Sequence, residues 1–245
     1  MDITNSYIDI HTHILPGVDD GPAYLIETIR MLKMEYEQGV KAIIATPHYI
    51  PGKKNMPADQ LQNIRDIVQE EAEKIAPDFK ILLGNELLYS ESVIEDLQAG
   101  KALTLANSRY VLVEFETAIN YDKLFKAIAD LTCAGYIPVI AHVERYQCLH
   151  RKDYLISDLI DAGCYIEMNA SSLVGNIFSN FDAIYNIKLV RQGLVHFIGS
   201  DCHDIERRKP CIIEAAKVLE KKCDIRQANR LCIDNPAKIL KNTYI

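Results

Sequence analysis

Short hydrophobic segments alternate with longer amphipathic segments along the chain, a pattern that predicts strands followed by helices. The seven predicted strands cover residues 7–11, 41–46, 79–84, 110–115, 137–141, 164–168 and 195–199. Segments such as VLVEF and VHFIG are nearly continuous apolar runs, which are typical of parallel strands covered on both faces. The pattern therefore predicts an α/β fold built around a parallel sheet.

The amphipathic segments predict the helices that connect these strands. From Leu25 to Tyr36, apolar residues recur every three or four positions, and Gly39 follows just past the end. Similar spacing predicts helices within residues 61–75, 124–133, 154–160, 184–191 and 213–219. An open doubly wound sheet and a closed or partly closed barrel both satisfy this order, and in both the ligands bind beyond the carboxyl ends of the strands. Since no linker, repeat or low-complexity segment interrupts the pattern, we expect a single domain covering residues 1–245.

Composition narrows the class of protein. The 245 residues are 49% hydrophobic and 25% charged, which is ordinary for a globular chain. A net charge of -7 argues against a nucleic-acid partner, because phosphate backbones require a clustered basic surface. Seven cysteines without a C-x-x-C pair indicate reduced thiols. A polar N-terminal segment and the absence of any run of about 18 apolar residues predict a cytoplasmic protein with no membrane insertion.

Histidines and carboxylates gather where the predicted strands end. Five of the seven histidines and four acidic residues occupy such positions: His11, His13, His48, His142, His203, Asp20, Glu86, Glu114 and Asp201. Any one of them alone would most often be an ordinary hydrogen-bonded side chain. Nine of them at one edge of a sheet would be costly to desolvate without a partner, and mixed imidazole and carboxylate ligands suit Zn, Mn or Fe better than Ca or Mg. The sequence therefore predicts a metal centre.

Two short motifs within this set strengthen the prediction. His11 and His13 are two positions apart at the end of a predicted strand, and side chains with this spacing point to the same face. Asp201 and His203 repeat the spacing after the last predicted strand. His11 and His13 could therefore hold one ion.

Several motifs resemble those of the polymerase and histidinol phosphatase (PHP) family: YIDIHTHILPGVDDG, IIATPHY, LLGNELLY, VLVEF, PVIAHVERY and FIGSDCH. The resemblance extends from His11 to at least Arg208 and is greatest to the bacterial manganese-dependent protein-tyrosine phosphatases of capsule and exopolysaccharide operons. It implies a distorted (β/α)7 TIM-like barrel and three divalent metal ions. The implied ligand sets are His11, His13, Glu86 and Asp201 for one ion, Glu86, Glu114 and His142 for a second, and Asp20, His48 and His203 for a third.

Two of these positions bear on the metal. Many members of the family carry a histidine where Glu114 stands and another at Asp20, so the two carboxylates favour the phosphatase branch and manganese, with iron or zinc as alternatives. Glu86 would bridge two of the ions.

Phosphate chemistry follows from such a centre. Three divalent ions would outweigh four carboxylates and leave the pocket positive, and a metal-bound water with its pKa lowered toward about 7 could attack phosphorus. Arg145 in HVERY and Arg208 in ERRKP are candidate phosphate clamps, because a guanidinium offers paired donors to phosphoryl oxygens. The resemblance implies that the substrate is the phosphotyrosine tail of a bacterial tyrosine autokinase. Histidinol phosphate or another small phosphomonoester, an exonuclease-like phosphodiester reaction and a non-catalytic metal-binding regulatory module remain alternatives.

A rival mechanism arises from the C-x5-R spacing of Cys202 and Arg208, which is also that of cysteine-dependent tyrosine phosphatases. That mechanism requires a thiolate in a loop of backbone N–H donors around the phosphate. The intervening loop has no glycine and carries Asp204 and Glu206, which would repel a phosphate. We therefore expect the Cys202 side chain to point away from the metal centre, toward the core.

Overall fold

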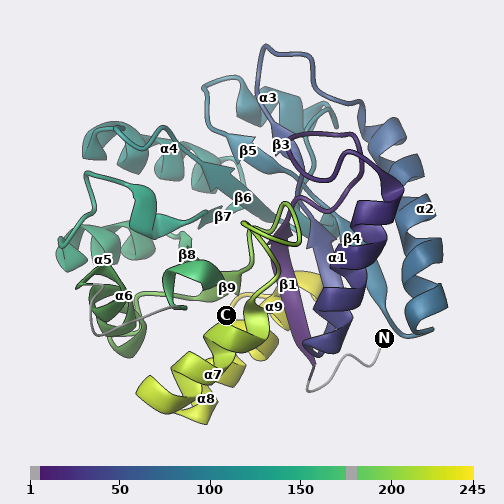
Figure 1. Ribbon diagram of the computed structural model, residues 1–245. Coiled ribbons are helices and arrows are strands. Elements are labelled where there is room, and N and C mark those ends of the chain that lie inside the picture. Colours follow the sequence, from purple (N-terminus) through teal and green to yellow (C-terminus); the bar gives the residue numbers. More distant parts are fainter. Residues whose placement is uncertain (1–5, 175–180) are drawn as a thin grey trace.

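The computed structural model describes residues 6–174 and 181–245, and it places a curled parallel sheet among helices (Figure 1). The strands are β1 (Tyr7–Thr12), β2 (Val40–Ala45), β3 (His48–Tyr49), β4 (Lys80–Leu83), β5 (Glu86–Leu88), β6 (Tyr110–Glu114), β7 (Ile137–Ile140), β8 (Tyr165–Asn169) and β9 (Phe197–Gly199). The helices are α1 (Leu25–Glu37), α2 (Ala58–Ile75), α3 (Val93–Gln98), α4 (Tyr121–Cys133), α5 (Asp153–Asp161), α6 (Phe181–Arg191), α7 (Ile212–Lys222), α8 (Ile225–Asn229) and α9 (Asn235–Leu240). In Figure 1, α1 and α2 cover one side of the strands, and α4, α5 and α6 lie on the opposite side.

All strand pairs are parallel, in the orders β1-β2-β4 and β3-β5-β6-β7-β8-β9. The two groups are continuous, because the Gly84 amide after β4 donates to the Ala45 carbonyl of β2 over 2.8 Å and the Glu86 amide of β5 donates to the Thr46 carbonyl after β2 over 3.3 Å. At the other edge, the Asp201 amide after β9 donates to the His11 carbonyl of β1 over 2.8 Å. The sheet therefore curls into at least a half-barrel, with β1 beside β9.

The seven predicted strands and six predicted helices are all present, with ends shifted by a few residues. Two short strands were missed, since β3 and β5 resume the direction of β2 and β4 after a two-residue break. The final strand is shorter than predicted and begins at Phe197, because the preceding His196 uses its ring Nδ1 to accept a hydrogen bond from the Ile166 amide. Short helices such as α3 have too few residues to show a helical period.

Alternate side chains of the strands enter two clusters of buried residues. The cluster inside the curl includes Ile8, Ile10, Ile44 and Leu112 and is closed by Ile239 of α9. The larger cluster fills the space between the sheet and the surrounding helices. Both faces of the sheet are thus covered, which leaves the carboxyl ends of the strands as the place for polar chemistry. No helix in the described part of the chain is long and apolar enough to cross a membrane.

Candidate metal centre

All nine predicted residues lie together at the carboxyl ends of the strands. The ligand atoms of eight of them form three overlapping groups, and the ninth, His142, contacts Glu86 through its Nε2 at 2.8 Å. One group contains His11, His13, Glu86 and Asp201, the second His13, Asp20, His48 and His203, and the third His48, Glu86 and Glu114. Within each group the ligand atoms lie within 4.8 Å of one another. Segments more than 180 residues apart in the sequence therefore meet at one site, because parallel strands all end at the same edge.

Glu86, the first residue of β5, lies at the middle of the cluster and is almost fully buried. Its carboxylate oxygens contact four imidazole nitrogens: His11 Nε2 at 3.3 Å, His13 Nε2 at 3.2 Å, His48 Nδ1 at 3.1 Å and His142 Nε2 at 2.8 Å. Glu86 is thus the one carboxylate in the described structure that belongs to two of the three groups.

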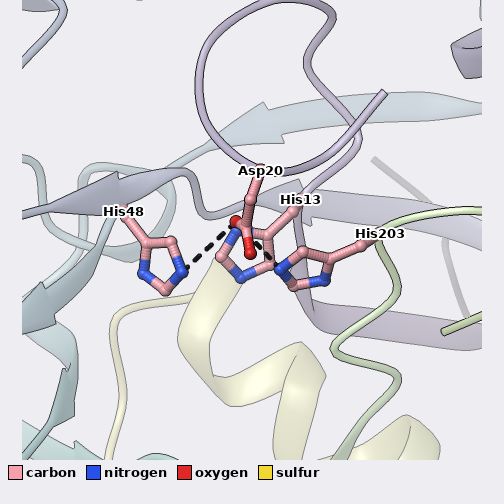
Figure 2. Close-up of side chains that lie close together, drawn as sticks. All are labelled: His13, Asp20, His48 and His203. Carbon is pink, nitrogen blue, oxygen red and sulfur yellow. Dashed lines mark ion pairs between the residues drawn. The ribbon is translucent and has the colours of Figure 1, made fainter. Parts of the chain in front are cut away.

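Glu114 and Asp20 contact different ring nitrogens of His48. Glu114 Oε1 is 3.3 Å from His48 Nδ1, and Glu114 Oε2 is 3.6 Å from His142 Nε2. Asp20 lies on the solvent side, where its Oδ1 is 3.5 Å from His48 Nε2 and 3.2 Å from His203 Nε2 (Figure 2). His48 therefore contacts carboxylates of two different groups.

A test of whether these residues fit a metal comes from their ring nitrogens. His11 Nε2, His13 Nε2, His48 Nδ1 and His203 Nε2 are buried and have no hydrogen-bond partner among the described residues. Buried polar atoms are nearly always satisfied, and each of these nitrogens faces a carboxylate of the cluster. Imidazole nitrogens and carboxylates arranged in this way are the donor set of a divalent transition-metal site, so the residues fit such ions.

Irregularities in the backbone set the direction of several of these side chains. The pairing register of β1 with β2 shifts between Asp9 and Thr12, which is the mark of a bulge. Ile10 belongs to the inner apolar cluster, yet the adjacent His11 also reaches Glu86, so the simple alternation of strand side chains does not hold here. His142 and Asp201 adopt left-handed backbone with φ of 35° and 52°, which is unfavourable for non-glycine residues and is common at functional sites.

Arg145 and Arg208 converge on one carboxylate. Arg145 Nη2 is 2.6 Å from Asp201 Oδ2, and Arg208 Nη2 is 2.7 Å from Asp201 Oδ1. Both guanidinium groups are partly open to solvent, with exposed fractions of 40% and 39%. Each therefore has donors left to meet a ligand that approaches from the mouth of the site.

The close contacts in the cluster shift the pKa values of its carboxylates and histidines in opposite directions. Burial by itself raises the pKa of Glu86, but the His11 charge and the close imidazoles of His13 and His142 outweigh it and hold that pKa well below its usual range. Burial by itself lowers the pKa values of His48 and His142, but the close carboxylates of Glu114 and Glu86 outweigh it and raise these pKa values to about 10 and about 9. His203 is the exception, since burial together with the His13 and Arg208 charges lowers its pKa to about 4.

Three further polar residues face the cluster and were not predicted. The Asp19 carboxylate contacts His13 Nδ1 at 2.7 Å, Glu167 contacts His11 Nδ1 at 3.5 Å, and Asn169 Nδ2 donates to Asp201 over 2.8 Å. The signals in the sequence were the Asp-Asp doublet and two polar residues in the otherwise apolar run YIEMN. Burial of a polar side chain in a strand indicates a specific partner, but it does not say which one.

Cys202 points away from the cluster, as predicted. Its side chain is fully buried, and its thiol lies 3.6 Å from Glu35 of α1. Burial, with the nearby Glu35 and Asp9 charges, raises the pKa of the Cys202 thiol well above its usual range. A buried thiol of high pKa is a poor nucleophile, which argues against thiolate catalysis at the C-x5-R motif.

A family model and curated relatives both match nearly the whole chain. Residues 7–241 match the model of a family described as capsular polysaccharide synthesis, CpsB/CapC. The tyrosine-protein phosphatase CpsB of Streptococcus agalactiae is 34% identical, over 97% of this chain and 100% of that protein. The tyrosine-protein phosphatase YwqE of Bacillus subtilis is 36% identical, over 97% of this chain and 93% of that protein.

Solved structures agree with these relatives. A chain from crystal structures of YwqE of Bacillus subtilis and CpsB of Streptococcus pneumoniae, described as metal-dependent tyrosine phosphatases, superposes with a TM-score of 0.89 at 32% identity, covering 97% of this chain and 96% of that chain. A phosphotriesterase homology protein of Escherichia coli, crystallised with phosphate in its active site, superposes with a TM-score of 0.63 at 12% identity, covering 98% and 100% of the two chains. The second likeness concerns the fold alone.

Proposed function

Because this chain belongs to the CpsB/CapC family of capsular polysaccharide synthesis, we propose that it is a metal-dependent protein-tyrosine phosphatase. The observation that carries the proposal is the cluster around Glu86, where buried ring nitrogens without hydrogen-bond partners in residues 6–174 and 181–245 face carboxylates of the same site. The fold is then a distorted (β/α)7 barrel of PHP type formed by a single domain of residues 1–245.

The nine clustered residues would hold three divalent ions, with Glu86 as the bridging carboxylate. Manganese is our first assignment, with iron or zinc as alternatives, because nitrogen and carboxylate ligands occur together. Such ions, when bound, activate water and neutralise charge on phosphoryl oxygens.

The residues of the chain itself would bind and orient the phosphate. Arg145 and Arg208 lie at the open side of Asp201, and their free donors suit the non-bridging oxygens of a phosphate dianion. The Asp201 contacts keep both guanidinium groups in place before the substrate arrives, so less entropy is lost on binding. Removal of either arginine should therefore weaken phosphate binding.

The substrate that we propose is the phosphotyrosine tail of a bacterial tyrosine kinase that acts in capsule or exopolysaccharide synthesis. The support is that relatives covered along nearly their whole length are named tyrosine-protein phosphatases. A cytoplasmic location would place the enzyme in the same compartment as such a tail.

Turnover of a phosphotyrosyl peptide, of a phosphoseryl peptide with the same sequence and of histidinol phosphate by manganese-loaded protein tests the proposal. We expect the phosphotyrosyl peptide to have the highest kcat/KM, and Arg145→Ala and Arg208→Ala each to raise its KM. A higher kcat/KM for histidinol phosphate would indicate a small-molecule phosphatase. Hydrolysis of no ester at all, by protein that binds its metals, would indicate a non-catalytic regulatory module.

A further inference from the structure

Two carboxylates that belong to none of the ligand groups lie behind the His-x-His pair. Asp19 Oδ2 is 2.7 Å from His13 Nδ1, and Glu167 Oε2 is 3.5 Å from His11 Nδ1. The other ring nitrogen, Nε2, faces Glu86 at 3.2 Å in His13 and at 3.3 Å in His11. On the side away from the centre, His13 therefore has a hydrogen bond with an outer carboxylate, and His11 has an outer carboxylate at ion-pair distance without a hydrogen bond.

Two backbone amides also hold the Asp19 carboxylate in place. Its Oδ1 accepts a hydrogen bond from the Gly21 amide over 3.1 Å, and its Oδ2 also accepts one from the His48 amide over 3.1 Å. The loop is pressed against the residue that follows β1, since a Cβ on Gly21 would lie 2.1 Å from the His13 carbonyl oxygen. Asp19 is thus fixed as a partner of His13, whereas the neighbouring Asp20 faces His48 and His203 (Figure 2).

Glu167 occupies the corresponding position behind His11. Its carboxylate is fully buried in β8 and accepts hydrogen bonds from the His142 amide over 2.5 Å and from the Gly199 amide over 3.1 Å. A Cβ on Gly199 would lie 2.7 Å from Glu167 Oε1, so the close approach requires glycine at this position. The contact with His142 also holds the left-handed backbone of that residue.

These contacts bear on which nitrogen of each histidine would bind a metal. A neutral imidazole binds a metal through the nitrogen that carries no hydrogen, and an outer carboxylate keeps the hydrogen on the other nitrogen. We propose that Asp19 and Glu167 are positioning residues that keep the hydrogen on Nδ1 of His13 and His11, so that both histidines present Nε2 to a divalent ion. The proposal rests on the metal-dependent function proposed above.

Zinc affinity, measured by competition with a chromophoric chelator, is the first test. We expect Asp19→Ala and Glu167→Gln each to weaken binding by about 10- to 100-fold, which is the usual effect of removing such a partner. The matched control is Glu35→Gln, which makes the same change in an equally buried glutamate behind β1. Burial and the Asp9 charge raise the pKa of Glu35 well above its usual range, so glutamine resembles its protonated form, and the affinity should stay within about twofold of wild type.

Long-range proton–nitrogen NMR spectra of the zinc-loaded protein give a readout that a merely structural role would not change. Wild type should show Nδ1–H for both His11 and His13, and Asp20→Asn should keep the His13 signal although it alters a proposed ligand. Asp19→Ala should lose or shift the His13 signal while the His11 signal stays. If Asp19→Ala does not fold, Asp19→Asn takes its place, and we expect a smaller loss of affinity in the same direction.

Folded Asp19 and Glu167 variants that keep wild-type zinc affinity and both Nδ1–H signals would overturn the proposal. That outcome leaves the proposed phosphatase activity standing, because turnover of the phosphotyrosyl peptide is measured separately on wild-type protein. Wild-type protein that binds zinc with the expected signals but hydrolyses no ester would support the positioning roles and contradict the proposed function.

Discussion

Replacement of Glu86 by glutamine should lower the free energy of unfolding and the metal content more than any other single carboxylate-to-amide change in the cluster. The side chain is almost fully buried and contacts the imidazoles of four histidines, whereas Glu114 contacts two and is 19% exposed. Removing one partner from a buried ionic cluster costs about 3–5 kcal/mol, because the remaining charges lose their compensation. For Glu114→Gln we expect a smaller cost, on the order of 1.5–3 kcal/mol, which is typical of a lost hydrogen bond to a charged group.

The loss of unfolding free energy in Glu86→Gln should become smaller as the pH rises. Burial lowers the pKa of His48, but the close carboxylates of Glu114 and Glu86 outweigh it and raise this pKa to about 10, above that of the unfolded chain. Such a group contributes its full stability below the unfolded pKa of about 6.5 and loses it as the pH rises toward about 10. The difference in unfolding free energy between wild type and Glu86→Gln should therefore shrink between pH 6 and pH 10.

Urea unfolding of chelator-treated protein at pH 6 and pH 10 measures these free energies, and metal analysis after manganese reconstitution measures binding. We expect Glu86→Gln to hold less metal than Glu114→Gln, since its carboxylate belongs to two ligand groups. A Glu86→Gln protein with wild-type stability and a full complement of metal would refute the central role of this carboxylate.

Three further outcomes follow from the structure. Cys202→Ser should keep most of the phosphatase activity, because its buried thiol faces Glu35 rather than the cluster; an inactive variant that still binds metal would restore the case for thiolate catalysis. Chelation should abolish turnover, and manganese should restore it better than magnesium, since five of the clustered residues are histidines; equal rescue by magnesium would contradict the ligand set. Burial and the Arg230 charge lower the pKa of His196 to about 4. Between about pH 6.5 and pH 4, His196 therefore binds a proton in the unfolded chain but not in the folded protein. The free energy of unfolding should fall by up to about 3 kcal/mol as the pH falls through this range. Urea unfolding of wild type and His196→Gln across this range tests the last point, because the dependence should be weaker in the variant.

The sequence by itself determined the class of fold and the edge of the sheet where chemistry occurs. Apolar runs too short for helices, separated by amphipathic segments, leave a parallel α/β arrangement as the simplest solution. Because parallel strands share one carboxyl edge, residues as distant as His11 and His203 could be assigned to one site from their positions after strands. The same reasoning predicted that Cys202 faces the core.

Only the tertiary structure decided which contacts each side chain makes within that site. The sequence does not distinguish Asp19 from Asp20, and only the fold of the loop places one behind His13 and the other between His48 and His203. The bulge in β1 breaks the two-residue alternation, so the direction of His11 follows from the pairing of β1 with its neighbour rather than from local pattern. The convergence of Arg145 and Arg208 on Asp201 joins segments that lie 56 and seven residues from it in the chain. Contacts of this kind depend on distances between strands, which local patterns of polarity do not encode.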